Sequence, residues 1–444
     1  MRVKVSRDIA RLDPATAVVF CGPSIFAFTS LSFCNSAMFS PRFLCEIVVD
    51  CCAEFGDPST LLVCSFICRS WARRSRQHYF KTTHISSAAQ AGSFLNLISE
   101  PMSFIAFSEI QALVLGKDQG YVHDWCWHWL PVLLEVLPSV KALTFSMADH
   151  EIHSAFEVHS MPSGRDEGVF MAPINLVPAS LRMTTLKLAG CHFFSLRQLF
   201  LVLSQFTLLE DLTLERLQFK NLESDTFVCN IGVYKYVQHL VYLKRLRVDF
   251  LAVKSSRGEV SSYVAFMMPS VEVLSLRMPK TKDEWLMMQQ LLRGLRGSLV
   301  ELEWRECGDM RGDWNNINLG LNVFRVRAMC FSGIRQQWLD RSGTPPKSMI
   351  PLVLFQIYEG HDLRSIIFNV QDPDVVVAMN GFLCRAIDKA LEGRTFFKLS
   401  QLVIQVKEQR IGMTRALPMQ YRAWIQSIFP LAYGRGIGLK VERA

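Results

Sequence analysis

The strongest constraint on the fold is a short apolar pattern that recurs along most of the chain. Each copy has an apolar residue, two others, a second apolar residue, one other and a third apolar residue, as in Leu209-x-x-Leu212-x-Leu214. The central residues of the copies are Leu113, Leu143, Leu186, Leu212, Leu246, Leu274, Leu302, Phe324, Ile366 and Leu402, with a fragment at Leu439 and Val441. Alternation at period two predicts a short strand in each copy.

Helical patterns lie between several of these strands. Apolar residues recur at helical spacing over 122–137, 196–206 and 374–391, and Thr281-x-x-Glu284 is a capping box that opens a further helix. Strand, helix and strand at this spacing predict parallel strands joined by right-handed crossovers. Residues 90–444 therefore resemble a leucine-rich-repeat solenoid of the α/β class. An ordinary open α/β sheet is the alternative that the irregular spacing leaves open.

The residues between the buried positions of each strand are the candidate target-binding surface. In a curved solenoid they point to the concave face, and in the middle of the row many are arginine. Guanidinium groups bind carboxylate or phosphate through two parallel hydrogen bonds. We expect this row to dock an acidic or phosphorylated segment of a target protein, and a solvated sheet face is the alternative. The candidate residues are Arg247, Arg277, Glu303, Arg305, Arg325 and Arg327.

The stretch 41–84 predicts a separate, small domain of three short helices. Ser40 and Pro41 are a cap and a first-turn proline, Gly56 breaks the helix that follows, and Asp57-Pro58 starts a second one. Leu61, Cys64, Cys68 and Trp71 continue that second helix at steps of three and four residues. The cationic run 69–76 is expected to close it, because cations suit the carboxyl end of a helix.

The same stretch resembles the F-box of fungal F-box proteins, of the basidiomycete type. The matching residues are Pro41, Glu46-Ile47 and Asp50, then Asp57-Pro58-x-Thr60-Leu61-Leu62-x-Cys64-Ser65-x-x-Cys68-Arg69-x-Trp71, then Ser75-Arg76-x-x-Tyr79-Phe80. Ser40 and Phe43 stand where the family usually has Leu and an acidic residue. The resemblance implies binding to a Skp-type adaptor and, through it, to a cullin ubiquitin ligase. The adaptor-contacting residues that it implies are Pro41, Leu44, Ile47, Leu61, Leu62, Cys68 and Trp71. A helical hairpin in the core of an α domain is the alternative.

Several classes of chemistry find no support in the sequence. It contains no phosphate-binding loop, nucleophile elbow or HExxH motif, so we expect no catalytic residues and no cofactor. His150, His153 and His159 lie in an insertion, 148–178, that reads as a surface loop, so we expect no metal. The thirteen cysteines include no CxxC pair, which favours free thiols in the cytoplasm or nucleus. The net charge of +8 is dispersed, which argues against nucleic acid as a partner.

Residues 1–40 read as a poorly ordered leader. No charge occurs between Pro14 and Pro41, but Gly22-Pro23 interrupts the apolar run, so we expect no membrane span. The working protein is hypothesised to begin at Met38.

Together these observations predict a non-catalytic substrate receptor of a Skp–cullin–F-box ubiquitin ligase. The alternatives are a repeat scaffold outside any ligase, and a membrane-associated repeat protein anchored through residues 14–41.

Overall fold

The computed structural model describes residues 47, 49–53, 58–99, 109–116, 124–146, 182–193, 199, 202–219, 240–249, 268, 270–279, 282–295, 297–305, 325–334, 349–355, 357, 362–370, 381–392, 396–406 and 425–443. The chain divides into two compact units. The first comprises residues 1–83 and 97–110, and the second comprises residues 84–96 and 111–444.

The first unit is mainly helical. Residues 47 and 49–53 are helical, and two helices follow, α2 (Pro58–Cys64) and α3 (Arg69–Lys81). The prediction that the second helix continues through residues 69–76 is wrong. Backbone hydrogen bonds from Phe66 to Val63 and from Ile67 to Cys64 form a tight turn after α2, and Cys68 is extended, with φ −157° and ψ 170°. The cationic run 69–76 therefore opens α3 rather than closing α2.

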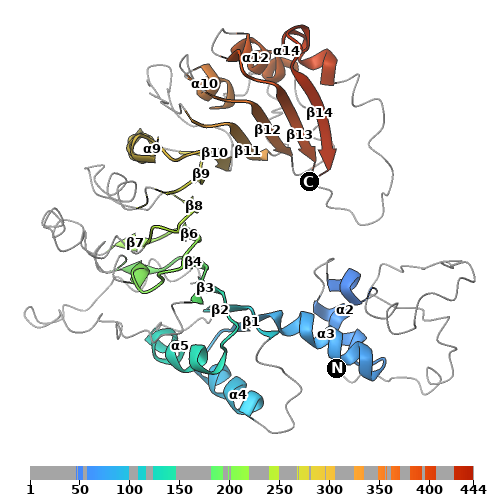
Figure 1. Cartoon of the computed structure of the whole chain (residues 1–444), viewed down its shortest axis with the longest axis vertical. Coiled ribbons are helices and arrows are strands. Elements are labelled where there is room, and N and C mark those ends of the chain that lie inside the picture. The colour runs from blue at the N-terminus through green and yellow to red at the C-terminus, as the bar shows by residue number, and fades with distance from the viewer. Residues whose placement is uncertain are drawn as a thin grey trace, which may run out of the picture. The chain divides into compact units, whose positions relative to one another are not determined.

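The second unit is built on one long sheet with helices in between (Figure 1). The strands of the main sheet are β1 (Thr82–Ile85), β2 (Ala112–Leu115), β3 (Ala142–Ser146), β4 (Thr185–Ala189), β6 (Asp211–Glu215), β8 (Arg245–Val248), β9 (Val273–Arg277), β10 (Glu301–Arg305), β11 (Ala328–Ile334), β12 (Ser365–Val370), β13 (Gln401–Val406) and β14 (Gly438–Arg443). The helices are α4 (Ala88–Ser99), α5 (Asp124–Val136), α9 (Lys282–Leu295), α10 (Met349–Phe355), α12 (Gly381–Leu391) and α14 (Pro430–Gly434). A second sheet pairs β5 (His192–Phe193) with β7 (Gln218–Phe219).

The strands of the main sheet follow one another in chain order, and every pairing from β2 to β14 is parallel. The apolar pattern explains this order. In the copy at β6, Leu209, Leu212 and Leu214 are all at most 1% exposed, while Asp211 and Thr213 between them remain partly exposed. Each strand–helix repeat can bury its apolar faces only against the neighbouring repeats, as in other stacked-repeat proteins. The solenoid of parallel strands predicted from the sequence is confirmed, and its architecture is leucine-rich-repeat-like.

One predicted strand is wrong. The copy centred on Phe324 was expected to form a strand over 321–326. Residues 321–324 lie outside the described part of the chain, Arg325 and Val326 are not in a strand, and β11 begins at Ala328. Val326, Met329 and Phe331 form a second, overlapping copy of the same pattern, and all three are at most 1% exposed. This copy forms the strand because Met329 and Phe331 align with Leu302 and Trp304 on one side and with Ile366 and Phe368 on the other. The Phe331 and Phe368 rings also stack, with centroids 5.6 Å apart.

The predicted helices are largely found where expected. α5 lies within 122–137, α9 follows the Thr281 capping box, and α12 occupies the second part of 374–391. In 196–206, the described residues 199, 202 and 203 are helical. Residues 1–40, the three histidines of 148–178 and residues 374–380 lie outside the described part of the chain. Within that part, no helix is long and apolar enough to cross a membrane.

Candidate functional site

The core of the helical unit contains two of the predicted adaptor contacts. Leu61 and Trp71, each 6% exposed, pack with Val49 and Cys64, which are fully buried. Cys52 and Ala53 pack against this cluster. Leu61 and Trp71 therefore join the first helix, α2 and α3 to one another, and any effect that they have on binding acts through the shape of the unit.

An ion-pair clamp ties the same helices together at the surface. Arg74 donates from Nε to Asp50 Oδ1 at 2.7 Å and from Nη2 to Asp50 Oδ2 at 2.9 Å, and His78 Nε2 lies 2.7 Å from Oδ1. The Arg74 hydrogen bond holds the pKa of Asp50 below its usual value; burial opposes this shift, and the His78 contact adds to it. The bidentate geometry fixes the first helix against α3.

Apolar side chains are exposed on α2 and on the turn after it. The exposed fractions are 48% for Leu62, 49% for Val63, 79% for Phe66 and 48% for Ile67, with Ile47 of the first helix at 43%. We call these five residues the helical apolar surface. Cys68 is also exposed, whereas Pro41 and Leu44 lie outside the described residues. Exposed apolar groups concentrated on so small a unit are typical of a surface that binds another protein.

The side chains between the buried positions of each strand form one face of the sheet, which we call the open face. Charged side chains on this face pair across neighbouring strands. Glu215 accepts Lys187 Nζ at 2.8 Å on one oxygen and Arg247 Nε at 3.2 Å on the other. Glu303 accepts the hydroxyls of Ser275, at 2.6 Å, and Ser332, at 2.8 Å.

Two other predicted arginines are also engaged within the chain. Arg305 is 7% exposed, and its Nη2 donates to Asp249 Oδ1 and to the Val248 carbonyl. Arg277 Nη2 lies 3.9 Å from Glu284 Oε1. With Arg247 on Glu215, three arginines of the predicted target-binding row are held by acids of this chain, so the row is less cationic than the sequence suggested.

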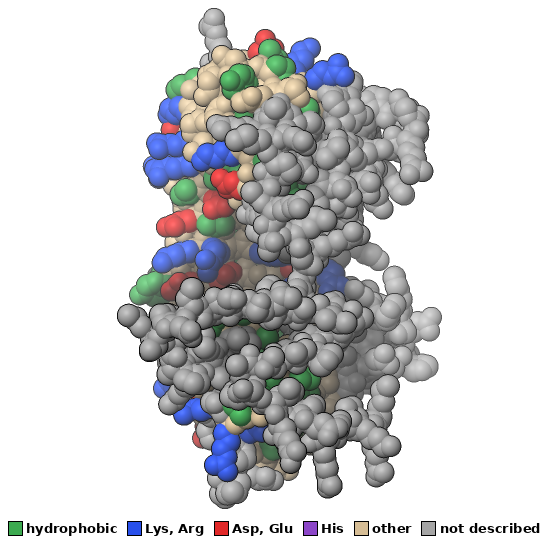
Figure 2. Space-filling view, turned by 90° about the vertical axis from the view of Figure 1, so that its right-hand side faces the viewer, with side chains coloured by type: hydrophobic (Ala, Val, Ile, Leu, Met, Phe, Trp, Pro, Cys, Tyr) green, Lys and Arg blue, Asp and Glu red, His purple; other side chains and the backbone are tan. Residues whose placement is uncertain are grey.

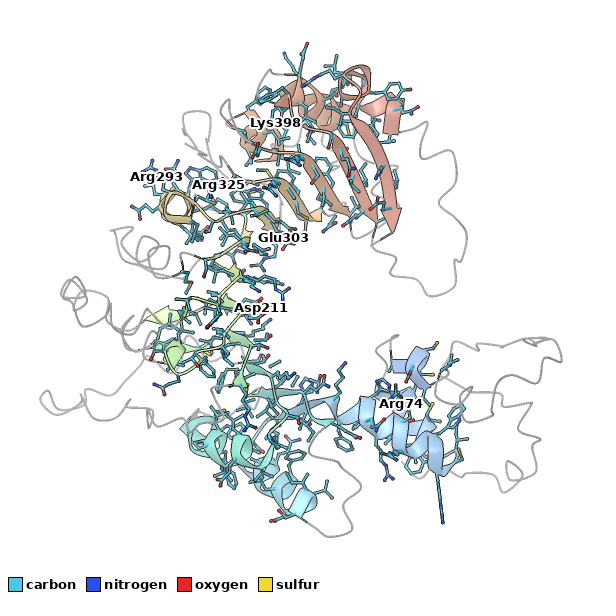
Figure 3. All side chains as sticks on the ribbon, in the orientation of Figure 1. Arg74, Asp211, Arg293, Glu303, Arg325 and Lys398 are labelled. Carbon is cyan, nitrogen blue, oxygen red and sulfur yellow. The ribbon has the colours of Figure 1, made fainter. Side chains whose placement is uncertain are left out.

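Arg325 and Arg327 do not lie in that row. Both precede β11 and are exposed, and Arg325 Nη1 donates to the Gly297 carbonyl at 2.7 Å. The position on β11 that aligns with Glu303 is instead Cys330. Figure 3 shows Arg325 and Lys398 toward the helix side of the strands, whereas Glu303 points away from it.

Sequence reasoning missed a third surface, at the edge where the strands begin. The residue that immediately precedes each strand, the second position of the apolar pattern, projects from this edge. From β11 to β13 those residues are Arg327, Arg364 and Ser400, all exposed. The second position of each copy can be read from the sequence. At β11 it was misassigned, because the copy centred on Phe324 was taken as the strand in place of the copy centred on Met329.

The described residues offer no sign of a metal site, and several of their thiols are buried. They include no group of three or more His, Cys, Asp or Glu side chains that could hold a metal ion. Burial raises the pKa of Cys126, Cys191, Cys330 and Cys384 to about 12, so these thiols stay protonated at neutral pH.

Comparisons with known proteins identify no family for this chain. No family model matches the chain, and no curated protein matches it. The solved structures that match include the leucine-rich repeat-containing protein LegL7 from Legionella pneumophila, at 13% identity and a TM-score of 0.39, covering 80% of this chain and 94% of that one. A likeness at this level says nothing about function.

Proposed function

We propose that this chain is a non-catalytic receptor of a Skp–cullin–F-box ubiquitin ligase. The helical unit docks on a Skp-type adaptor, and the stacked-strand unit holds a target protein. The observation that carries the proposal is the helical apolar surface, which coincides with the part of the sequence most similar to an F-box.

The energetics of that surface suit a stable complex. Burial of an exposed Leu, Ile or Phe side chain contributes about 1.5–3 kcal/mol, less the part that is already covered. About half of this gain is still available at Leu62, Val63 and Ile67, which are 48–49% exposed, and most of it at Phe66, which is 79% exposed. Because they follow one another on α2 and its turn, one partner groove can cover them together. The buried Leu61 and Trp71 act indirectly, by keeping that surface in shape.

The mechanism that follows is proximity. A receptor of this kind contributes no reacting group; it raises the effective concentration of the target's lysines at the ligase's transfer site. The ubiquitin-transfer chemistry resides in partner subunits.

The proposal is tested by co-purification of the full chain with a Skp-type adaptor. We expect the wild type to retain the adaptor and Leu62→Asp/Phe66→Asp to lose it, since two carboxylates would be buried in an apolar groove. The matched control is Leu208→Asp/Leu286→Asp, which alters side chains of similar exposure in the sheet unit, at 46% and 45%. The control should retain the adaptor. A wild type that does not bind, or equal retention by all three proteins, contradicts the proposal.

The second candidate is a repeat scaffold outside any ligase. Ser40 and Phe43, which depart from the F-box pattern, favour it. A wild-type chain that captures a target but no adaptor would identify this function.

A further inference from the structure

The edge of the main sheet where its strands begin is a continuous backbone ladder. For the strands β3, β4, β6 and β8–β13, the residue that immediately precedes the strand donates its backbone N–H to the carbonyl of the corresponding residue one strand earlier, at 2.7–3.0 Å, and Gln111, before β2, accepts the first of these bonds. The members are Gln111, Lys141, Thr184, Glu210, Lys244, Glu272, Val300, Arg327, Arg364 and Ser400. We call this row the strand-start ladder. Its hydrogen bonds place neighbouring members one strand apart, about 4.8 Å.

The signs of the charges along this ladder alternate before β11 and are the same in two neighbours from β11 on. Before it, acids and bases alternate: Glu210 precedes Lys244, and Glu272 follows it. From β11 on, Arg327 and Arg364 are direct neighbours of the same sign. All five side chains are exposed. Figure 2 shows this edge on the left, where red and blue side chains alternate and blue ones gather above them.

Further cations surround the arginine pair. Arg325 lies two residues before Arg327, and Lys398 two residues before Ser400. Asp362 pairs with Lys398, and this contact lowers the pKa of Asp362, with smaller contributions in the same direction from Arg364 and Arg327. Among the described residues, neither Arg327 nor Arg364 has an acidic partner within 4.0 Å. Glu301, at the start of β10, aligns with Ala328, the residue after Arg327.

We propose that Arg325, Arg327, Arg364 and Lys398 bind an Asp/Glu-rich segment of the target protein. The inference rests on the proposed function only in naming the target as the partner. Two adjacent guanidinium groups match a carboxylate, and a bound acidic segment relieves their mutual repulsion. Phe397, 62% exposed, lies beneath the Lys398 ammonium at 5.3 Å and provides the apolar contact that a peptide side chain needs.

The ladder itself favours a short acidic peptide over a nucleic acid. The cationic cluster spans about three strands, or about 10–15 Å, which is the reach of a few extended residues. A duplex carries one negative charge per about 1.7 Å over its whole length. Running along this edge, it would next meet Glu272 and Glu210, which repel it.

Fluorescence anisotropy with a short labelled oligoglutamate peptide tests the proposal on the full chain. We expect Arg327→Glu/Arg364→Glu to weaken binding at least about tenfold, because it replaces two attractive contacts with two repulsive ones. The matched control is Lys141→Glu/Lys244→Glu, which makes the same change in net charge in the alternating part of the ladder. We expect it to weaken binding less than about twofold.

Equal weakening by the two variants would reduce the effect to net charge and overturn the proposal, as would a wild type that does not bind oligoglutamate. A labelled oligothymidylate that binds more tightly, and is lost with the same two arginines, would reassign the surface to nucleic acid. Since all four altered side chains are exposed, the thermal midpoints of both variants should match the wild type. Adaptor co-purification is a separate readout, so failure here leaves the ligase proposal standing, and the reverse also holds.

Discussion

Strands β4–β10 and strands β11–β13 have the same parallel pairing but differ in how their charged side chains are paired. In the first region, carboxylates of one strand accept cations of another, as Glu215 does from both Lys187 and Arg247. In the second region, the aligned open-face positions carry Cys330, Ile367 and Val403, and the cations stand at the strand-start edge. Parallel register fixes the position of each side chain, so the difference lies in residue type alone. Internal pairing stabilises the first region, whereas in the second region Lys398 pairs with Asp362 but Arg327 and Arg364 have no acidic partner among the described residues.

The largest effect expected from this comparison is at the buried pair of the first region. Arg305→Ala leaves the Asp249 carboxylate, 11% exposed, without its cation. We expect the free energy of unfolding to fall by about 3–5 kcal/mol in urea titrations, as for other broken buried pairs. Arg305→Met/Asp249→Leu removes both charges and should recover most of the loss. A loss below about 1 kcal/mol for Arg305→Ala would mean that the pair does not stabilise this region.

A smaller effect is expected where the pairing is more exposed. Glu215→Gln removes the carboxylate that Lys187 and Arg247 share, and those side chains are 38% and 45% exposed. Solvent screens such pairs, so we expect a loss of about 1 kcal/mol or less, measured by the same titration. Glu442→Gln, on the exposed end of β14, is the control and should change nothing. Equal effects of the two substitutions would remove the distinction between the regions.

Reversing the charge of a single acidic residue should move the boundary between the two regions. Glu272→Lys places a cation next to Lys244 and extends the cationic part of the strand-start ladder past Val300 toward β8. We expect oligoglutamate to bind about threefold more tightly in anisotropy titrations. Glu210→Lys makes the same charge change two ladder positions further from Arg327 and should have less effect. An equal gain from both would indicate that net charge, rather than position, governs binding.

The smallest effect is expected at Cys330, which stands where β10 has Glu303. Burial raises its pKa to about 12, with smaller contributions from Glu303 and Glu301 in the same direction. Because the folded-state pKa lies far above pH 8, about one thiol in ten thousand is ionised there. Alkylation of the native protein at pH 8, followed by peptide mass spectrometry, should modify exposed Cys51 and Cys68 and spare Cys330. Rapid modification of Cys330 would contradict the close packing of β11.

The sequence predicted the repeated strands well because each one depends on local alternation. It failed at β11 because two overlapping copies, centred on Phe324 and Met329, satisfy the same pattern, and only pairing with β10 and β12 selects between them. It failed between α2 and α3 because a tight turn preserves the apolar spacing from Leu61 to Trp71. Spacing also cannot separate Trp71, buried in the unit's own core, from Phe66, which is exposed.

The pairing of the charged side chains could not be predicted from the sequence. Whether Arg305 is free depends on Asp249, which is 56 residues away in sequence and close only after the strands stack. The sequence therefore could not show that Arg247, Arg277 and Arg305 are paired within the chain. The strand-start ladder can be recognised once each strand has its register, because its members occupy the second position of each copy of the apolar pattern.

The central claim, that one chain carries two independent binding surfaces, is tested most directly by a bridging measurement. A Skp-type adaptor is immobilised, the full chain is added, and retention of labelled oligoglutamate is recorded. The account predicts retention with the wild type, loss of both chain and peptide with Leu62→Asp/Phe66→Asp, and loss of the peptide alone with Arg327→Glu/Arg364→Glu. A wild-type chain that binds the adaptor yet retains no peptide, or one whose peptide retention survives the arginine substitutions, would contradict it.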